Sequence, residues 1–156
     1  MKFNDETLNL LRELYARAVF EEEANTELSK TLDSIKSAHH LVLSYKGSNT
    51  ALKAKYVINP YVKWNVLKEA GIYFEKAIKK NPECLEARFL RYAVESNIPA
   101  FLNMSKNVEE DKAVIINKFS EFYALNPGLA KAYANYLLGS IYFVKKEKEI
   151  ITKVIN

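Results

Sequence analysis

Two arginines and a glutamate form the most chemically suggestive group in the sequence. Arg88, Arg91 and Glu95 are spaced three and then four residues apart, which places them on one face of a helix. Guanidinium groups bind carboxylates through paired hydrogen bonds, so this face would suit an acidic peptide segment. Two alternatives stay open at this point: a simply solvated face, or an internal ion pair between Arg91 and Glu95 at i, i+4.

Other polar clusters predict structure rather than chemistry. His39 and His40 are adjacent, and neighbours on a helix point about 100° apart, so they are not expected to share a metal. The acidic runs at 21–23 and 109–111 lie where helices are expected to begin, and acids there complement the helix dipole. Cys84 falls in the first turn of an expected helix, where a thiol pKa is lowered, but no catalytic partner is near it in the sequence.

Sequence signatures of catalysis are missing. The chain has no Ser-His-Asp pattern, no glycine-rich phosphate loop and no dinucleotide-binding fingerprint. It also lacks the alternating oxygen ligands of an EF-hand. We therefore predict no catalytic residue, no cofactor and no metal site.

Length and composition are those of one globular domain. The chain has 156 residues, of which 49% are hydrophobic and 27% charged, with only four glycines and four prolines. So few turn residues disfavour an all-β fold, and no apolar run reaches the roughly 18 residues of a membrane span. The acidic start differs from a signal peptide, which favours a cytoplasmic location, with a removed targeting segment as the alternative.

Charge is unevenly distributed along the chain. The net charge is +4, but residues 1–35 hold four basic residues against eight acids, and residues 51–80 hold seven lysines against two glutamates. Segments of opposite sign favour attraction within the fold or between copies in a homo-oligomer. Because no nucleic-acid-binding motif accompanies the lysines, nucleic acid is not expected as a partner.

Asn-Pro dipeptides divide the chain into helices. Asn is a good N-cap and Pro suits the first helical position, so Asn59-Pro60, Asn81-Pro82 and Asn126-Pro127 each predict a helix start. Asn107 with Glu110 resembles a capping box, and 47–49, Gly-Ser-Asn, is either a break or a tolerated interruption. The predicted helices, with boundaries uncertain by about 2–4 residues, span roughly 5–20, 22–33, 38–58, 60–80, 82–97, 107–124, 127–138 and 140–154.

A degenerate repeat relates two parts of the chain. Pro82 and Pro127 are 45 residues apart, each has an alanine five residues later, and Phe74 and Phe119 each lie eight residues before them. A repeat of this kind predicts stacked helix pairs.

Four residues give this repeat a family resemblance. Ala70, Phe74, Ala77 and Pro82 are spaced four, three and five apart, and in this spacing the chain resembles the second helix of a tetratricopeptide (TPR) repeat. The whole chain is similar to uncharacterised bacterial TPR-like proteins. It departs from the family where a Gly-Leu pair is expected, because Arg91-Tyr92 stands near that place. The resemblance implies an all-α stack of about seven or eight antiparallel helices, an α-solenoid with a right-handed superhelix, over one domain, 1–156.

The expected function is a non-catalytic protein-protein interaction or scaffold module. The resemblance implies a concave face lined by first helices, on which a peptide segment of another protein docks. The expected binding residues are Arg88, Arg91, Glu95, Tyr92 and Phe101, the last in an apolar insertion between the repeat copies. An enzyme or small-molecule binder with an inter-helix pocket, and a homo-oligomeric scaffold, are the alternatives.

Overall fold

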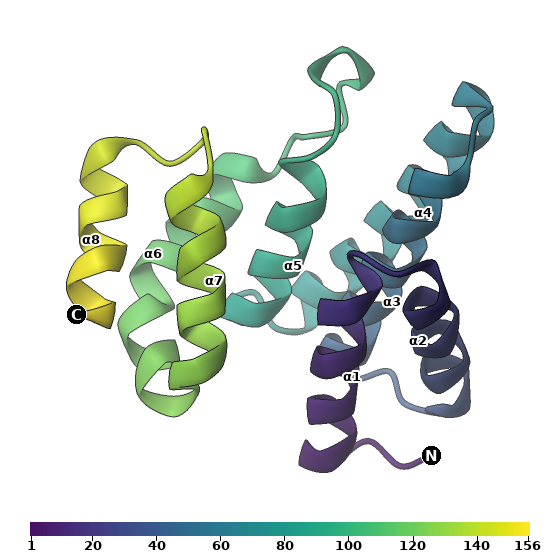
Figure 1. Ribbon diagram of the computed structural model, residues 1–156, viewed down its shortest axis with the longest axis horizontal. Coiled ribbons are helices and arrows are strands. Elements are labelled where there is room, and N and C mark those ends of the chain that lie inside the picture. Colours follow the sequence, from purple (N-terminus) through teal and green to yellow (C-terminus); the bar gives the residue numbers. More distant parts are fainter. The chain divides into compact units, whose positions relative to one another are not determined.

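The structure is a computed structural model that describes residues 1–156 (Figure 1). It contains eight α-helices, two short 3-10 helices and no strand, so the all-α prediction is confirmed. The chain divides into two compact units, Met1–Pro82 and Glu83–Asn156. No helix is both long enough and apolar enough to cross a membrane.

The first unit contains two helix hairpins with adjacent helices antiparallel (Figure 1). Helix α1 packs on α2, α3 packs extensively on α4, and both α1 and α2 contact α3. The core between them includes Leu11, Leu28, Tyr45 and Phe74, all almost fully buried. The elements are α1 Asp5–Ala18, α2 Glu22–Ser34, α3 His40–Lys53, η1 Ala54–Tyr56 and α4 Pro60–Lys80.

The second unit is also built from antiparallel neighbours. Helix α5 packs on α6, α6 packs on α7 and α8, and α7 packs on α8. Its core is rich in aromatic residues, and Phe89 and Tyr133 stack with ring centroids 3.6 Å apart. The elements are α5 Leu85–Glu95, η2 Ala100–Leu102, α6 Val108–Leu125, α7 Pro127–Gly139 and α8 Lys145–Ile155.

The three Asn-Pro dipeptides mark helix boundaries, but only one acts as a complete cap. Asn59 accepts hydrogen bonds from the backbone amides of Tyr61 and Val62, and Pro60 opens α4 as predicted. Pro127 also opens α7, although the Asn126 side chain makes no cap bond. Asn81 ends α4, whereas α5 begins only at Leu85, because the Asn81 side chain contacts His40 instead of the next helix.

Residues 47–49 do not break α3, which runs without interruption through them. Gly47 faces the ring of Phe74 on α4 so closely that a Cβ there would lie 3.0 Å from two ring carbons. Asn49 is buried and donates to the side-chain oxygen and the backbone carbonyl of Asn25 on α2. The glycine therefore allows close approach of α3 to α4, and the asparagine joins α3 to α2.

The 45-residue offset seen in the sequence equals the length of one helix hairpin with its connection. Helix α3 begins at His40 and α5 at Leu85, and α4 ends at Lys80 while α6 ends at Leu125. Both differences are 45 residues. Phe74 and Phe119, the aromatic residues of the repeat, are buried at equivalent positions of α4 and α6.

We expect alanine substitutions at two glycines to separate helix propensity from packing. Gly71 lies inside α4, and a Cβ added to it would have no neighbouring atom within 4 Å, so Gly71→Ala should raise the free energy of unfolding by about 0.5–1 kcal/mol. Gly47→Ala gains the same propensity but crowds Phe74, and overpacking typically costs about 1–3 kcal/mol. Chemical denaturation should therefore give Gly47→Ala a free energy of unfolding that is lower than that of Gly71→Ala by at least about 1 kcal/mol. Equal effects at the two positions would contradict the close approach of α3 to α4.

Candidate functional site

The predicted binding face of α5 is an internal face. Arg88, Arg91, Tyr92 and Glu95 retain 4%, 5%, 0% and 7% of their accessible surface, respectively. Helix α6 and the residue that precedes it cover Arg88, Arg91 and Glu95, whereas Tyr92 packs towards α7. Of the five predicted residues only Phe101 is exposed, at 85%.

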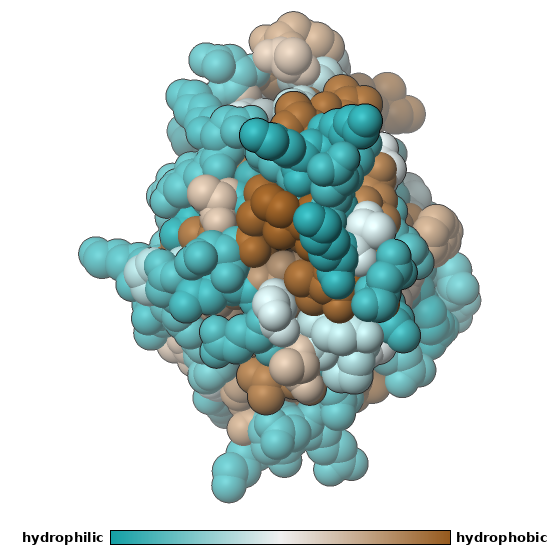
Figure 2. All heavy atoms as spheres, turned by 90° about the vertical axis from the view of Figure 1, so that its left-hand side faces the viewer, coloured by the Kyte–Doolittle hydropathy of each residue, from teal (hydrophilic) through white to brown (hydrophobic).

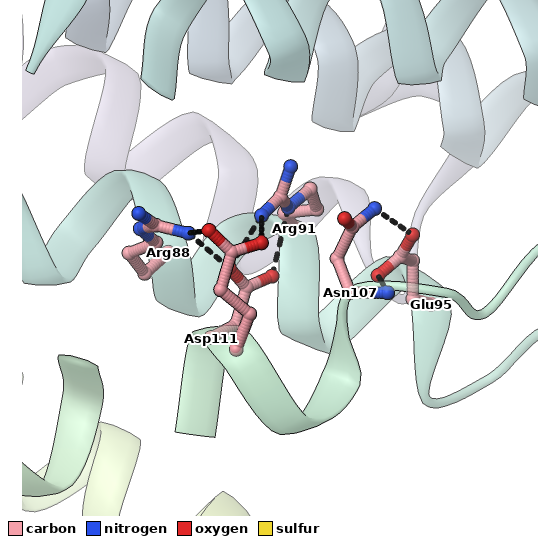
Figure 3. Close-up of polar contacts among 6 residues, drawn as sticks. Arg88, Arg91, Glu95, Asn107 and Asp111 are labelled. Carbon is pink, nitrogen blue, oxygen red and sulfur yellow. Dashed lines mark hydrogen bonds and ion pairs between the residues drawn. The ribbon is translucent and has the colours of Figure 1, made fainter. Parts of the chain in front are cut away.

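Asp111 on α6 is the partner of both arginines (Figure 3). The Nε and Nη2 atoms of Arg91 donate to its two carboxylate oxygens at 2.8 and 2.7 Å. Arg88 Nη1 donates to Oδ1 at 3.1 Å. The Asp111 side chain has no exposed surface, so a bidentate pair and a second guanidinium neutralise a fully buried carboxylate.

Glu110 closes the outer edge of this cluster. Its carboxylate lies 3.0 Å from Arg88 Nη1 and 3.5 Å from Arg91 Nη2, with 60% of the side chain exposed. The hydrogen bond from Arg88 lowers the pKa of Glu110. Two guanidiniums therefore meet two carboxylates, which leaves this four-residue group without net charge.

Glu95 is held by the end of the connection that leads into α6. Its Oε1 accepts from Asn107 Nδ2 at 2.8 Å, and its Oε2 accepts from the Asn107 backbone amide at 3.2 Å (Figure 3). Burial raises the pKa of Glu95, and the Asn107 side chain opposes that shift. Because Asn107 binds Glu95, it makes no side-chain cap on α6, and the predicted capping box with Glu110 is wrong. The partner of Arg91 is likewise Asp111, not Glu95 at i, i+4.

Tyr92 joins α5 to the connection between α7 and α8. Its hydroxyl forms a short hydrogen bond with the Ser140 hydroxyl, and its ring meets Tyr136 and Phe143 edge-on. Burial raises the pKa of Tyr92 to about 12. The side chain is thus part of the core of the second unit rather than a contact surface.

Lys112 is a buried charge that no motif in the sequence indicated. Its ammonium donates to the Tyr142 carbonyl at 2.7 Å and lies 3.1 Å from Glu147 of α8. It also lies 5.5 Å from the centroid of the Phe143 ring. Lys112 therefore attaches α6 to α8 and to the connection before it.

A signal for the buried carboxylate was present in the spacing of α6. Asp111, Ile115 and Phe119 lie at i, i+4 and i+8, and all three are fully buried. That spacing puts Asp111 on the core-facing stripe of its helix. The acidic run at 109–111 does occupy the first turn of α6, as predicted, but one of its members points inward.

The histidines and the cysteine have structural surroundings. His39 Nδ1 accepts from the Leu41 amide at the start of α3, and its ring packs on Phe3 and His40. Cys84 is the residue before α5 and is half-buried. No group of three or more His, Cys, Asp or Glu side chains lies in position to hold a metal ion.

The accessible part of the second unit that best suits a ligand lies at one end. A groove of about 420 Å³ is found there, between the residues that follow α5 and those that follow α7. Figure 1 shows both connections at the same end of this unit. Phe101 in the first connection and Ile141 in the second are 85% and 91% exposed. The groove is lined by both polar and apolar surface, from Ser96, Asn97, Asn135, Tyr136, Gly139, Ser140, Ile141 and Tyr142.

A second apolar surface lies on the side of α8. Figure 2 shows brown patches between hydrophilic side chains on this face. Val144, just before α8, is 59% exposed, and Ile150 within it is 44% exposed. Val154 and Ile155 are partly buried against the core of the unit.

Comparisons with known proteins give no relative for this chain: no protein-family model, curated protein or solved structure matches it.

Chemically, the charged cluster is suited to holding two helices together. Its donors and acceptors are matched to one another. Burial disfavours the charge on Arg91, but the hydrogen bond to Asp111 and the surrounding carboxylates outweigh it and raise the pKa of Arg91. None of the carboxylates in the cluster lines the groove. The groups left for a ligand are the hydroxyls, amides and aromatic rings of the groove.

We expect Asp111→Asn to lower the free energy of unfolding by about 3 kcal/mol, because it leaves two buried guanidiniums without their main carboxylate. Glu110→Gln removes a carboxylate that is 60% exposed, and should cost less than about 1 kcal/mol. Urea denaturation of the two variants checks this difference. A similar loss of unfolding free energy in both variants would show that the burial of Asp111 does not determine the cost of removing its charge.

We expect stability to fall as pH rises above about 10. The folded-state pKa of Tyr92 is raised to about 12 and an unfolded tyrosine titrates near 10, so between these values the folded chain keeps a proton that the unfolded chain has lost. Stability contributed by the protonated phenol is complete below about pH 10 and is lost through about pH 12, by roughly 1–3 kcal/mol. Thermal unfolding between about pH 10 and pH 12 measures this loss of stability. Tyr92→Phe has no phenol to titrate, so its loss of stability over the same range should be smaller. An identical alkaline loss in Tyr92→Phe would assign it to other groups.

Proposed function

We propose that the chain is a non-catalytic protein-protein interaction or scaffold module. The observation that carries this proposal is the distribution of its side chains. The arginines and carboxylates of α5 and α6 bind one another in the interior, whereas large apolar side chains stay exposed at the ends of helix hairpins. Exposed apolar surface of this kind is typical of docking sites.

A TPR-like repeat is the architecture that we propose for these hairpins. Ala70, Phe74 and Ala77 are buried in α4, where the family pattern has small residues around an aromatic one. Gly47 on α3 supplies the close approach to Phe74 that a small first-helix residue would give. The hairpin length repeats once at 45 residues, in keeping with an α-solenoid built of helix pairs.

The surface proposed for a peptide is the end of the second unit that carries Phe101 and Ile141. These two side chains offer apolar anchors, and the groove between the two connections offers hydrogen-bonding groups. An apolar anchor beside polar groups is the usual anatomy of a peptide-binding interface. Tyr136, at 38% exposure, contributes both a ring and a hydroxyl, which already bonds with Ser96 and Asn97.

A small-molecule binder is the second candidate function. The same groove has a volume of about 420 Å³, which lies in the range of ligand pockets. Its lining is polar enough to orient a ligand. A peptide needs the exposed Phe101 in addition to the groove, whereas a small ligand needs only the groove, which Ile141 helps to line.

The proposed function is tested by affinity capture with the purified chain and two variants. We expect proteins retained by the parent to be lost with Phe101→Asp/Ile141→Asp. The matched control is Ile72→Asp, which changes a 47% exposed isoleucine on α4 of the first unit and should retain them. Each captured protein is then measured as a purified partner, where the double substitution should weaken binding by at least about tenfold, the usual effect of losing a hot-spot residue.

Three results would count against this proposal. Equal capture by all three proteins would exclude the Phe101 and Ile141 surface. Stabilisation of the parent by a metabolite, unchanged in Phe101→Asp alone, would favour the small-molecule alternative, because Phe101 does not line the groove. A mass in sedimentation that corresponds to several copies and falls with salt would favour the homo-oligomeric scaffold, through its acidic and basic segments.

A further inference from the structure

The end of the α3–α4 hairpin exposes an unusual amount of apolar surface. We call residues 53–68 the basic-aromatic tip. Between residues 55 and 66 no side chain is buried, and the first buried residue of α4 is Leu67. The exposed fractions of its large apolar residues are high: Tyr56 45%, Ile58 97%, Tyr61 72%, Val62 44% and Trp64 37%.

The charge of this region has one sign. The tip contains four lysines, at 53, 55, 63 and 68, and no arginine or acidic residue; the Lys55 ammonium donates to the Val19 carbonyl. Lys53, Lys63 and Lys68 of the tip form no ion pair, and the Lys68 ammonium lies 5.0 Å from the centroid of the Trp64 ring. The lysines are therefore available to an anionic partner, directly beside the exposed aromatic residues.

The fold does not need these apolar residues for its own core. Helix α4 has 21 residues, and its buried positions are confined to Leu67 and beyond. Its first seven residues extend past the packed part of the hairpin, and Asn59 and Pro60 fix their helical geometry. A hydrophobic surface is thus held in place at a projecting end of the first unit, where Figure 1 shows the start of α4.

We propose that the basic-aromatic tip docks on the surface of a bilayer that contains anionic phospholipids. Tyr and Trp side chains favour the level of the lipid headgroups, where a ring is partly apolar and its polar edge stays wet. Ile58, the most exposed apolar residue of the tip, enters the outer acyl region. The lysines contact headgroup phosphates, and their long aliphatic side chains let the ammonium groups reach the phosphates while the apolar residues enter the bilayer.

The composition of the tip favours a bilayer over the other anionic partners. Protein surfaces that bind nucleic acid usually combine arginine with aromatic rings that stack on the bases. The tip has no arginine, and the aliphatic side chains of Ile58 and Val62 cannot stack on a base. Protein interfaces are depleted in lysine at their centre, and the tip projects, whereas a peptide needs a groove. Aromatic and aliphatic residues flanked by lysine alone are typical of interfacial membrane segments.

Trp64 gives a direct readout of this proposal because it is the only tryptophan in the chain. The probes are vesicles of phosphatidylcholine alone and vesicles of phosphatidylcholine mixed with phosphatidylglycerol. We expect a blue shift of Trp64 emission, and quenching by lipids brominated near the headgroup, with the mixed vesicles. Partitioning into them should be at least about tenfold stronger than into neutral vesicles and should weaken with salt.

Two variants locate the contact. Lys53→Gln/Lys63→Gln should weaken partitioning about 25-fold, since each lysine near an anionic surface is worth about fivefold. Lys145→Gln/Lys146→Gln removes the same charge from exposed positions of α8 and should change partitioning by less than about twofold. Ile58→Ser/Tyr61→Ser should abolish the blue shift while leaving the circular dichroism unchanged, because neither side chain is buried.

The proposal is overturned if Trp64 emission is unaffected by anionic vesicles, or if the α8 control loses as much partitioning as the tip variant. Tighter binding to a single-stranded oligonucleotide or to a second copy of the chain than to the vesicles would also overturn it. The tip lies in the first unit, and the peptide surface proposed above lies in the second, so either proposal can fail while the other stands.

Discussion

Asp111 brings a full negative charge into the interface between α5 and α6, where it has no contact with water. Such a charge is tolerated only when it is paired and its oxygens are hydrogen-bonded. Arg91 meets both oxygens and Arg88 meets one, from positions three residues apart on α5. A shift of α6 by one residue would break this pairing, so the cluster fixes the register of the two helices. Tyr92 and Lys112, next to the cluster in sequence, then connect this hairpin to the residues around α8.

The two hairpins of the repeat, α3–α4 and α5–α6, hold their helices together through different kinds of contact. In the first unit the α3–α4 contact is close and apolar, with Gly47 against Phe74. In the second unit the equivalent hairpin, α5–α6, is held by ion pairs, and the rings around Tyr92 join α5 to α7 and to the connection before α8. Relative to apolar residues of the same volume, a buried ion cluster adds little net stability. The charges of the second hairpin therefore contribute little net stability beyond what apolar residues of the same volume would give.

Helix positions were predictable because local signals mark them, whereas the role of the charged residues was not. Periodicity and Asn-Pro dipeptides place most helix ends within a few residues, but α5 and α8 begin later than predicted, at Leu85 and Lys145, and α3 ends earlier, at Lys53. Spacing put Arg88, Arg91 and Glu95 on one face correctly, but spacing cannot say whether that face meets water or another helix. That depends on Asp111 and Asn107, which are distant in sequence. The sequence alone does not decide whether the apolar residues of the tip are exposed, because they have the same helical spacing as core residues.

The equality between the repeat offset and the hairpin length bears on how such a chain can change its size. Residues 83–127 span 45 positions, from just after Pro82 to Pro127, and they contain every member of the arginine and carboxylate cluster. Loss or duplication of this segment would therefore remove or copy all members of the cluster together. Neither event would leave one of those charges stranded in the interior. Recombination can therefore copy this cluster as a unit, whereas Lys112, which pairs with Glu147 outside the segment, would need a new partner in a second copy.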